Sequence, residues 1–197
     1  MAARYRSVRV DLGTGDGRAV LAAAAADPRR LAIGVDANAA GMTDSSRRAL
    51  RSRGGVPNAV FVVAAAEQLP PGLDGIADEV TVNFPWGSLL RGLLTGDAAV
   101  LDGLARIMKP GAALDILLSV TDRDGLPGLP VIDDATALAD LRTRYPAHGL
   151  TVTEIRALEP ADVIAAASSW GKRLGAGDRR HAWRISARRA AAPARTG

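Results

Sequence analysis

Cysteine is absent from the 197 residues, and histidine occurs only as His148 and His181. The absence of cysteine excludes disulfides, thiolate zinc sites and cysteine nucleophiles, and it fits a reducing cytoplasm. Two histidines argue against a metal site built from several imidazoles. We therefore expect no metal centre and look for chemistry that needs neither a thiol nor a metal ion.

Long apolar runs are also missing. The first ten residues contain charged side chains but no apolar core of a signal peptide, so we expect no secretory leader. Gly, Asp or Arg interrupts the longest apolar stretches well before the roughly 20 residues that a membrane span needs. The length suggests one domain, which can bury on the order of 70% of its unfolded surface.

Positive charge is in slight excess, with 25 Lys and Arg against 21 Asp and Glu, and nearly all of the excess is arginine. Arginine makes planar, bidentate contacts with phosphate that lysine cannot make. Arginine-rich and alanine-rich usage can also reflect genomic base composition. Only clustering of the arginines on the fold would therefore indicate a nucleic-acid partner.

Apolar strand-like segments alternate with helical ones along the chain, which favours a parallel α/β sheet. We expect one domain over residues 1–187 and a disordered tail over 188–197. Two long loops, 121–130 and 168–180, are candidates for function. The expected strands are 7–12, 31–36, 59–64, 79–83, 112–118, 151–157 and 182–187, and the expected helices are 17–26, 39–52, 98–108 and 133–145, with Asp133 or Asp134 as the cap of the last.

A glycine-rich turn, Asp11-Leu-Gly-Thr-Gly-Asp-Gly17, follows the first strand and opens a helix. Its spacing differs from the dinucleotide pattern Gly-x-Gly-x-x-Gly, because Arg18 occupies the third position, where close packing favours Gly or Ala. The two carboxylates, Asp11 and Asp16, also crowd the place that a pyrophosphate would need. An acidic turn suits a cationic ligand, and S-adenosylmethionine, with its ammonium and sulfonium groups, is such a ligand.

The next two strands add groups that fit this cofactor. The second strand ends in Asp36, nineteen residues after Gly17, where a carboxylate can accept both ribose hydroxyls. The backbone of the segment Ala66-Glu67 follows the third strand and can reach the adenine edge. We predict an S-adenosylmethionine site, with NAD as the alternative, formed by Asp11, Gly13, Thr14, Gly15, Gly17, Asp36, Ala37, Ala66, Glu67, Asn83 and Ser168.

Asn83-Phe-Pro-Trp-Gly-Ser-Leu-Leu90 places a rigid proline and a large aromatic just after an apolar strand. Loops beyond the carboxyl ends of strands are where open α/β sheets bind ligands. Trp86 is therefore either a core side chain or a platform that stacks on a planar substrate. The other two tryptophans, Trp170 and Trp183, are both candidates for a second platform, and for Trp183, which falls within an expected strand, core packing is favoured.

At this point the chain resembles the aminoglycoside-resistance 16S rRNA methyltransferases that modify N1 of adenine 1408 in the decoding site. The likeness extends from about Tyr5 to Ile185, and its most specific part is the Pro-Trp-Gly-Ser-Leu-Leu segment together with the later Ser-Trp. It rests on these segments: Asp11 to Gly17, Ala66-Glu-Gln-Leu-Pro70, Pro85-Trp-Gly-Ser-Leu-Leu-Arg-Gly92, Leu158-Glu-Pro160 and Ser169-Trp-x-Lys-Arg-Leu174.

The resemblance implies a Rossmann-like class I methyltransferase fold, with a mostly parallel seven-stranded sheet whose last strand is antiparallel. It also implies a target adenine that is flipped out and held between Trp86 and Trp170. Asn83 and Pro85 would shape that pocket. Ser168 would contact the cofactor carboxylate or serve as a helix cap. Neutral adenine N1 has a free lone pair, so we expect positioning rather than a general base to drive methyl transfer.

The arginines form two clusters that fit a folded rRNA surface in the 30S subunit. In the family, equivalent positions dock on rRNA, and one of them in the later loop contacts the distorted backbone, for which Arg180 is the best match and Arg173 the next. A solvated charged surface is the alternative. The clusters are Arg47, Arg48, Arg51 and Arg53 after the second strand, and Lys172, Arg173, Arg179 and Arg180 around Trp170.

One departure from the family lies at the start, where only Met1 to Arg6 precede the first strand and the family usually has an extension, often a hairpin. We therefore keep two alternatives to the decoding-site enzyme. One is a methyltransferase for tRNA or for a small planar metabolite. The other is a weakly active or inactive homologue that binds rRNA. In each case we expect a cytoplasmic monomer.

Overall fold

The computed structural model describes residues 2–121, 124, 127–129, 131–177 and 180–191, without the side chain of Trp170. Its strands are β1 Ser7–Leu12, β2 Arg30–Asp36, β3 Ala59–Val63, β4 Ala77–Asn83, β5 Met108–Leu118, β6 Leu150–Ala157 and β7 Trp183–Arg189. Its α-helices are α1 Arg18–Ala26, α2 Ala39–Ala49, α3 Gly87–Thr95, α4 Ala98–Ile107, α5 Leu141–Arg144, α6 Pro160–Ala165 and α7 Ser169–Leu174. Short 3-10 helices are Ala2–Arg4, Ala66–Gln68, Pro71–Leu73, Ala135–Leu138 and Tyr145–His148.

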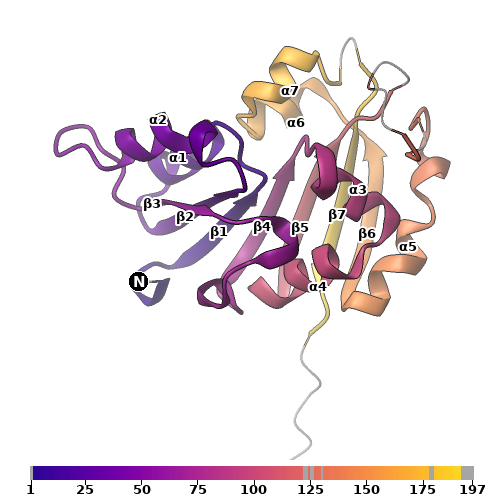
Figure 1. The fold of residues 1–197 in the computed structure, drawn as a ribbon, viewed down its shortest axis with the longest axis horizontal. Coiled ribbons are helices and arrows are strands. Elements are labelled where there is room, and N and C mark those ends of the chain that lie inside the picture. Colours follow the sequence, from indigo (N-terminus) through magenta and orange to yellow (C-terminus); the bar gives the residue numbers. More distant parts are fainter. Residues whose placement is uncertain (1, 122–123, 125–126, 130, 178–179, 192–197) are drawn as a thin grey trace, which may run out of the picture.

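The strands form one seven-stranded sheet in the order β3-β2-β1-β4-β5-β7-β6 (Figure 1). Neighbouring strands from β3 to β5 are parallel, whereas β7 is antiparallel to both β5 and β6. The predicted Rossmann-like methyltransferase fold is therefore confirmed, including the antiparallel last strand. The strand order reverses between β1 and β4, and in such sheets the crevice beyond that reversal is where ligands bind.

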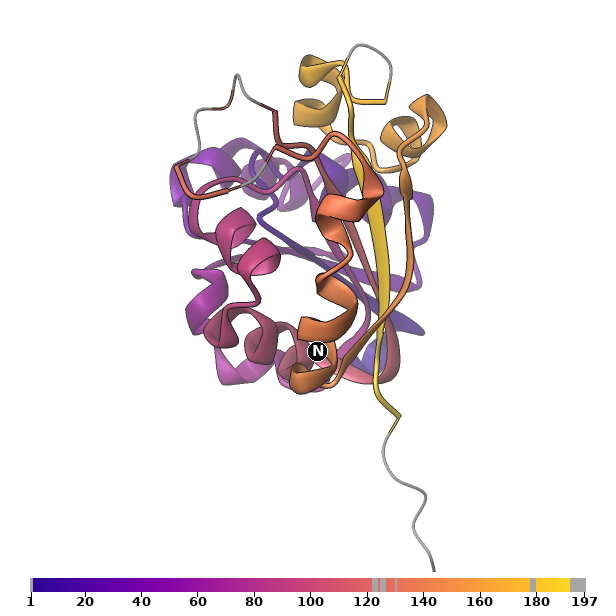
Figure 2. The same cartoon turned by 90° about the vertical axis from the view of Figure 1, so that its right-hand side faces the viewer.

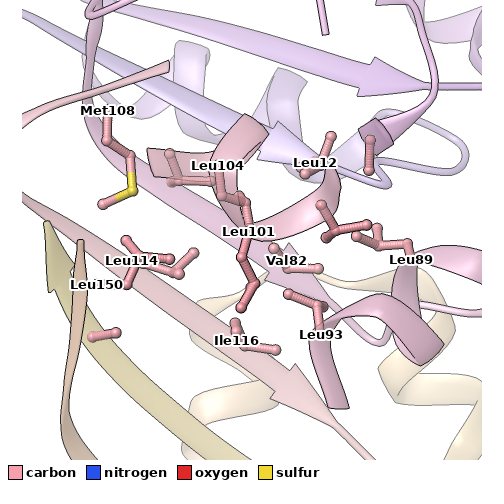
Figure 3. Packing of buried hydrophobic residues seen from close by; sticks show 14 of the residues in the cluster. Leu12, Val82, Leu89, Leu93, Leu101, Leu104, Met108, Leu114, Ile116 and Leu150 are labelled. Carbon is pink, nitrogen blue, oxygen red and sulfur yellow. The ribbon is translucent and has the colours of Figure 1, made fainter. Parts of the chain in front are cut away.

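Helices cover both faces of the sheet, and β2 shows how the sequence achieves this (Figure 2). Leu31 and Ile33 point into the main core with α3 and α4, while Ala32 between them packs against Val20 and Leu21 of α1. This alternation follows from the two-residue period of a strand. Figure 3 shows the main core, in which side chains of β4 and β5 such as Val82 and Ile116 meet leucines of α3 and α4.

Most expected elements are present, and the main differences lie after β4. The helix expected over 133–145 is instead a 3-10 turn, the four-residue α5 and a second 3-10 turn. Asp134 does cap the first turn, accepting from the Thr136 amide at 2.7 Å. The loop expected over 168–180 contains α7, and α3 was not expected at all. The expected domain boundary after Ala187 falls inside β7.

No helix in the part of the chain that the structure describes is long and apolar enough to cross a bilayer.

Candidate functional site

A cavity of about 390 Å³ opens at the carboxyl ends of the strands, where the order reverses between β1 and β4. Its size lies within the range of small-molecule and cofactor sites, which is roughly 300–1,000 Å³. We call the part after β1, β2 and β3 the cofactor side, and the part formed by 83–89 and α7 the base side. The cofactor side comprises Asp11 to Asp16, Ala19, Val35 to Ala37 and Ala64 to Glu67; the base side comprises Asn83 to Trp86, Ser88, Leu89, Ser168, Ser169 and Arg173.

Asp11 is the centre of a buried hydrogen-bond network on the cofactor side. Its Oδ1 accepts from Thr81 Oγ1 and Asn83 Nδ2, each at 2.8 Å, and its Oδ2 accepts from Thr14 Oγ1 at 2.7 Å. Burial raises the pKa of the Asp11 carboxyl, and these hydrogen bonds oppose that shift. The carboxylate thus links the glycine turn after β1 to the end of β4.

Asp36 fixes the other edge of the glycine turn. Its Oδ2 accepts from the Gly15 amide and its Oδ1 from the Asn38 amide, both at 2.8 Å. Among the described residues that line the cavity, Asp36, Glu67 and the two aspartates of the turn supply four carboxylates, and Arg173 is the one arginine. A lining of this charge attracts a cation, so it fits the ammonium and sulfonium of S-adenosylmethionine.

Gly17 is the one predicted cofactor residue that the structure places outside the cavity lining. Its φ is +70°, and an added Cβ would lie 3.0 Å from Ser45 Cβ and closer still to the Phe61 ring. Glycine is required there because α1 starts against β3 and α2 at close approach. Contact of Gly17 with the cofactor therefore stays a prediction, whereas the other predicted cofactor residues all line the cavity.

Trp86 lies at the rim of the cavity and is 52% exposed. Pro85 before it is buried, and Trp86 itself is the residue before the first turn of α3. A large aromatic held half-exposed by a rigid segment presents a face on which a planar group can stack. Trp183, in contrast, is 9% exposed and donates its indole N–H to the Ile132 carbonyl at 3.1 Å, which confirms its predicted place in the core.

Helices α6 and α7, which we call the α6–α7 arm, bring the second tryptophan segment to the cavity. Trp170 belongs to α7, and its side chain lies outside the described part of the chain. Ser168 caps α7 by accepting from the Gly171 amide at 3.1 Å, and it also lines the cavity. Both roles expected for Ser168, helix cap and cavity residue, are therefore compatible.

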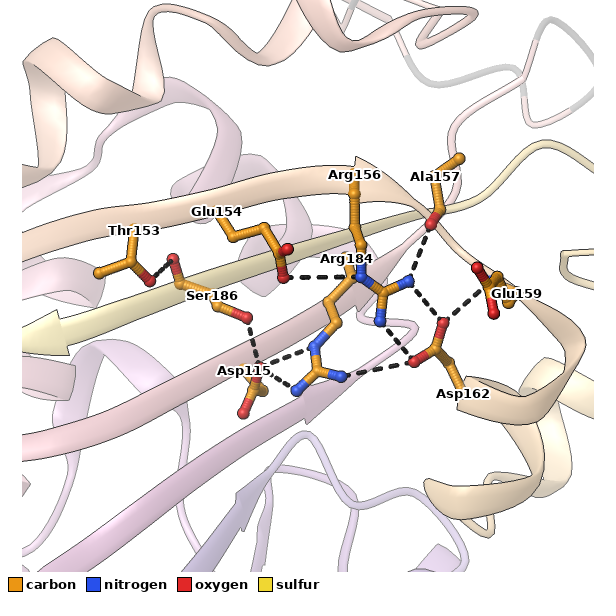
Figure 4. Close-up of polar contacts among 9 residues, drawn as sticks. All are labelled: Asp115, Thr153, Glu154, Arg156, Ala157, Glu159, Asp162, Arg184 and Ser186. Carbon is orange, nitrogen blue, oxygen red and sulfur yellow. Dashed lines mark hydrogen bonds and ion pairs between the residues drawn. The ribbon is translucent and has the colours of Figure 1, made fainter.

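An ion-pair network joins the arm to side chains of β5, β6 and β7 (Figure 4). Asp162 of α6 accepts two hydrogen bonds of 2.7 Å from the Arg156 guanidinium and lies 3.4 Å from Arg184 Nη1. Arg184 in turn donates to Asp115 Oδ1 at 2.7 Å. The hydrogen bonds from Arg156 lower the pKa of Asp162 to about 2. A bidentate arginine–carboxylate pair adds orientation as well as energy.

Arg180 is already paired within the protein. Its Nε donates to Ser119 Oγ at 2.8 Å, and its Nη2 donates to the Asp124 carboxylate. Burial alone would raise the pKa of Asp124, but the hydrogen bonds from Arg180 and Thr121 lower it. The predicted contact of Arg180 with rRNA therefore requires that it exchange a protein carboxylate for a phosphate.

The first arginine cluster is exposed at the end of α2 and just after it, and no ion pair is recorded there within the described residues. In the second cluster Lys172 and Arg173 are exposed, and Arg173 reaches the cavity. Arg179 lies outside the described residues. Both described groups are thus available to an anionic partner, as expected for Arg47, Arg48, Arg51, Arg53, Lys172 and Arg173.

Sequence reasoning did not assign every residue that the structure brings to the site, and Ser88, Ser169 and Thr81 are examples. Ser88 and Ser169 line the base side of the cavity. Ser88 lies two residues after Trp86 and Ser169 directly before Trp170, and this nearness to the tryptophans is the signal that could have found them. Thr81 supports Asp11 from β4. Because strand side chains alternate, Thr81 had to share a face with Asn83 two residues later.

The reversed strand order, the antiparallel β7 and the acidic cavity together define a class I S-adenosylmethionine-dependent methyltransferase. The family model NpmA, 16S rRNA (adenine(1408)-N(1))-methyltransferase, matches residues 1–189. The chain therefore belongs to the 16S rRNA (adenine(1408)-N(1))-methyltransferase family.

Individual relatives agree with this placement. The 16S rRNA (adenine(1408)-N(1))-methyltransferase of Streptoalloteichus tenebrarius is 36% identical over 179 residues, 87% of this chain and 81% of that protein. The enzyme of the same name from Escherichia coli is 32% identical over 191 residues, 93% of this chain and 87% of that protein. A crystal structure of such an enzyme from Catenulisporales acidiphilia, a tryptophan-to-alanine mutant with cosubstrate SAM, has a TM-score of 0.87 and 37% identity, covering 100% of this chain and 91% of that one.

Proposed function

We propose that the protein transfers a methyl group from S-adenosylmethionine to N1 of adenine 1408 in 16S rRNA and thereby confers aminoglycoside resistance. The observation that carries this proposal is Trp86, a half-exposed aromatic at the rim of an acidic cavity, in a chain of this family. When bound, the cofactor supplies the electrophilic methyl group, and the described residues bind and orient the reactants.

On the cofactor side, we assign the ribose hydroxyls to Asp36, whose two oxygens each have a lone pair beyond the backbone amide they already accept. Asp11 holds the turn that faces the methionine part, with Thr14 fixed against it. Glu67 and the backbone at Ala66 lie where the adenine part would be held. These groups orient the donor before the rRNA arrives.

On the base side, Trp86 and Trp170 stack on the two faces of the flipped adenine. Flipping costs a few kcal/mol of unstacking, and each stacked face returns roughly 1–3 kcal/mol. Methylation at N1 makes the ring cationic, and a π-face attracts that developing charge. The two rings thus bind the transition state more tightly than the neutral substrate.

Asn83 and Pro85 shape the pocket between the donor and the base. The Asn83 amide donates its N–H to Asp11, so its carbonyl oxygen is left as an acceptor at the cavity wall. The target nitrogen has no proton to remove, because N1 of neutral adenine carries a lone pair. Proximity and alignment therefore supply the catalysis, and no residue is needed as a general base.

The proposed partner is the assembled 30S subunit, which the protein binds as a monomer in the cytoplasm. Arg47, Arg48 and Arg51 form an exposed basic surface on and just after α2, and Arg173 lies beside the cavity. Such contacts with phosphate fix the orientation of a protein on RNA without reading its sequence. Docking of a folded rRNA surface would then present the decoding-site adenine to the base side.

Transfer of a radiolabelled methyl group to purified 30S subunits tests the proposal. We expect labelling of 16S rRNA in 30S particles and little labelling of 50S particles, tRNA or free adenosine. Labelling of tRNA or of a nucleoside instead of 30S subunits would overturn the proposed substrate. Cofactor binding without any transfer to 30S subunits would favour an inactive rRNA-binding homologue.

A further inference from the structure

The α6–α7 arm rests on a small apolar cluster that is separate from the main core. Phe84, Leu117 and Leu158 of this cluster come from the strand ends, and Val163 and Ala176 come from the arm and the turn after it. Phe84 is the residue between Asn83 and Pro85, so the chain that leads to Trp86 also supports the arm. The two segments that form the base side therefore meet at one aromatic ring.

The contact between Phe84 and the arm is made at Gly171, directly after Trp170 in α7. An added Cβ at Gly171 would lie 2.9 Å from Phe84 Cδ2, 3.0 Å from Cζ and closer still to Cε2. Glycine in a helix costs roughly 1 kcal/mol relative to alanine. The close approach of the ring explains why a six-residue helix nevertheless contains glycine at this position.

Backbone strain occurs on both sides of this contact. Among the described residues, the non-glycine positions with positive φ are Phe84, at 53°, and Ala167, at 51°. Each lies shortly before one of the tryptophan segments, two residues before Trp86 and three before Trp170. Such conformations cost on the order of 1–3 kcal/mol and persist only where the surroundings impose them. For Phe84 these surroundings are the hydrogen bond that its backbone N–H donates to the Leu117 carbonyl, at 2.7 Å, and the apolar cluster around its ring.

We propose that the Phe84 ring, seated against Gly171, is the spacer that sets the distance between the Pro85–Trp86 segment and α7. Phe84 and Gly171 are then positioning residues, which act through the width of the gap that receives the flipped adenine. The inference rests on the proposed function, because the spacer matters only if a planar base enters that gap. A displacement of about 1 Å at a reacting pair can reduce the rate about 10²-fold.

Gly171→Ala is the first test, since a methyl group there must push α7 away from Phe84. We expect kcat for 30S methylation to fall on the order of 100-fold, because alignment is lost. The KM for 30S subunits and the affinity for S-adenosylmethionine should stay within about twofold of wild type, because the arginine surfaces and the cofactor side are unchanged. Gly72→Ala is the matched control, since a Cβ there meets nothing within 4 Å, and its kcat should equal that of wild type.

Combining Gly171→Ala with Phe84→Leu distinguishes a spacer from general stability. The smaller side chain leaves room for the new methyl group, so the double variant should recover at least tenfold of the lost kcat, a positive coupling between neighbours. Phe84→Leu alone should lower kcat and leave the affinity for S-adenosylmethionine unchanged. This single variant tests the spacer if Gly171→Ala does not fold.

Two outcomes would overturn the spacer. One is wild-type kcat in Gly171→Ala or in Phe84→Leu. The other is an additive loss in the double variant. Failure of the wild-type protein to methylate 30S subunits would instead contradict the proposed function, so the two failures remain distinguishable.

Discussion

Asp11 and Asp162 anchor the two sides of the cavity, and they do so in different ways. Asp11 is buried, accepts from three uncharged side chains, and has a pKa raised by burial. Asp162 is paired with two arginines, and the hydrogen bonds from Arg156 lower its pKa to about 2. The cofactor side is thus framed by strand ends and a buried network. The base side depends on a short arm held by ion pairs and a small apolar cluster.

This difference suggests a division of labour between the two sides. A site for a small cofactor benefits from a rigid frame that is complete before binding. A pocket that receives a base from a large, folded RNA needs an element that adjusts on docking, and such elements have few buried contacts. In α6 the buried side chain is Val163, so the arm has little buried surface, and changes to the two sides should affect different steps.

Asp11→Ala should have the largest effect, because it leaves Thr14, Thr81 and Asn83 without their acceptor and removes a charge that faces the cofactor. We expect the affinity for S-adenosylmethionine to fall by roughly 100-fold or more, from hydrogen bonds to a charged group worth about 1.5–3 kcal/mol each. Isothermal titration calorimetry checks this. Asp16→Ala, in the same cavity wall, is the control and should lose less affinity; equal losses would contradict a special role for Asp11.

Trp86→Ala should affect the other side alone. Removing a stacking face worth roughly 1–3 kcal/mol should lower methyl transfer to 30S subunits by about 5- to 150-fold. Cofactor affinity should stay within about twofold of wild type. Trp86→Phe keeps a π-face and should recover part of the activity. A loss of cofactor affinity as large as the loss of transfer would mean that Trp86 belongs to the cofactor side.

Asp162→Asn should weaken the ion pairs that hold the α6–α7 arm against the sheet, and the resulting loss of stability should depend on pH. The pKa of Asp162 is lowered from 3.8 to about 2, so its stabilising contribution is complete above pH 3.8 and is lost as the pH falls towards 2. We expect a loss on the order of 1–2 kcal/mol of unfolding free energy at pH 7, which shrinks below pH 4. Urea unfolding at several pH values measures it.

A matched control for this variant is Asp140→Asn. Asp140 forms an exposed pair with Arg144 on one helical turn, with 79% of its side chain accessible. Such pairs contribute at most a few tenths of a kcal/mol. Equal losses of unfolding free energy in the two variants, or a loss from Asp162→Asn that does not depend on pH, would mean that the ion pairs of Asp162 do not hold the arm.

Single substitutions in the exposed arginine cluster should have the smallest effect. Arg47→Ala or Arg51→Ala should each lower 30S affinity modestly and reduce the slope of log affinity against log salt by about 1, the value for one lost phosphate contact. Arg29→Ala, at the opposite end of β2, is the control and should leave the slope unchanged. If the salt dependence of 30S affinity is unchanged in all three variants, the exposed arginine cluster does not contact rRNA.

The cofactor side was predicted almost completely from the sequence. Asp11 and Asp36 lie at the ends of buried strands and Glu67 shortly after one, and the strand ends of a parallel sheet meet at one edge. Gly17 shows that a glycine motif alone does not distinguish a glycine that lines the cavity from one that packs against a neighbouring element. Only the close approach of Phe61 distinguishes these roles.

The base side and the chain after β5 were predicted less well. Particular residues show the physical reasons. The segment with Trp86 was expected to be a loop beyond a strand, yet leucines from Leu89 onwards bury one face and stabilise α3. The helix expected over 133–145 is interrupted near Asp140, whose carbonyl accepts from the Thr143 hydroxyl. The pairing of Arg180 with Asp124 and the seat of Gly171 on Phe84 depend on contacts distant in sequence, which local patterns do not encode.

Primer extension on 16S rRNA from 30S subunits exposed to the protein and S-adenosylmethionine tests the central claim most directly. A methyl group on adenine N1 blocks Watson–Crick pairing, so reverse transcriptase stops beside the modified base and reports its position and chemistry together. We predict a strong stop at adenine 1408 that requires the cofactor and weakens sharply with Trp86→Ala. Full-length extension through that position with the wild-type protein, or a stop elsewhere in the rRNA, would contradict the account.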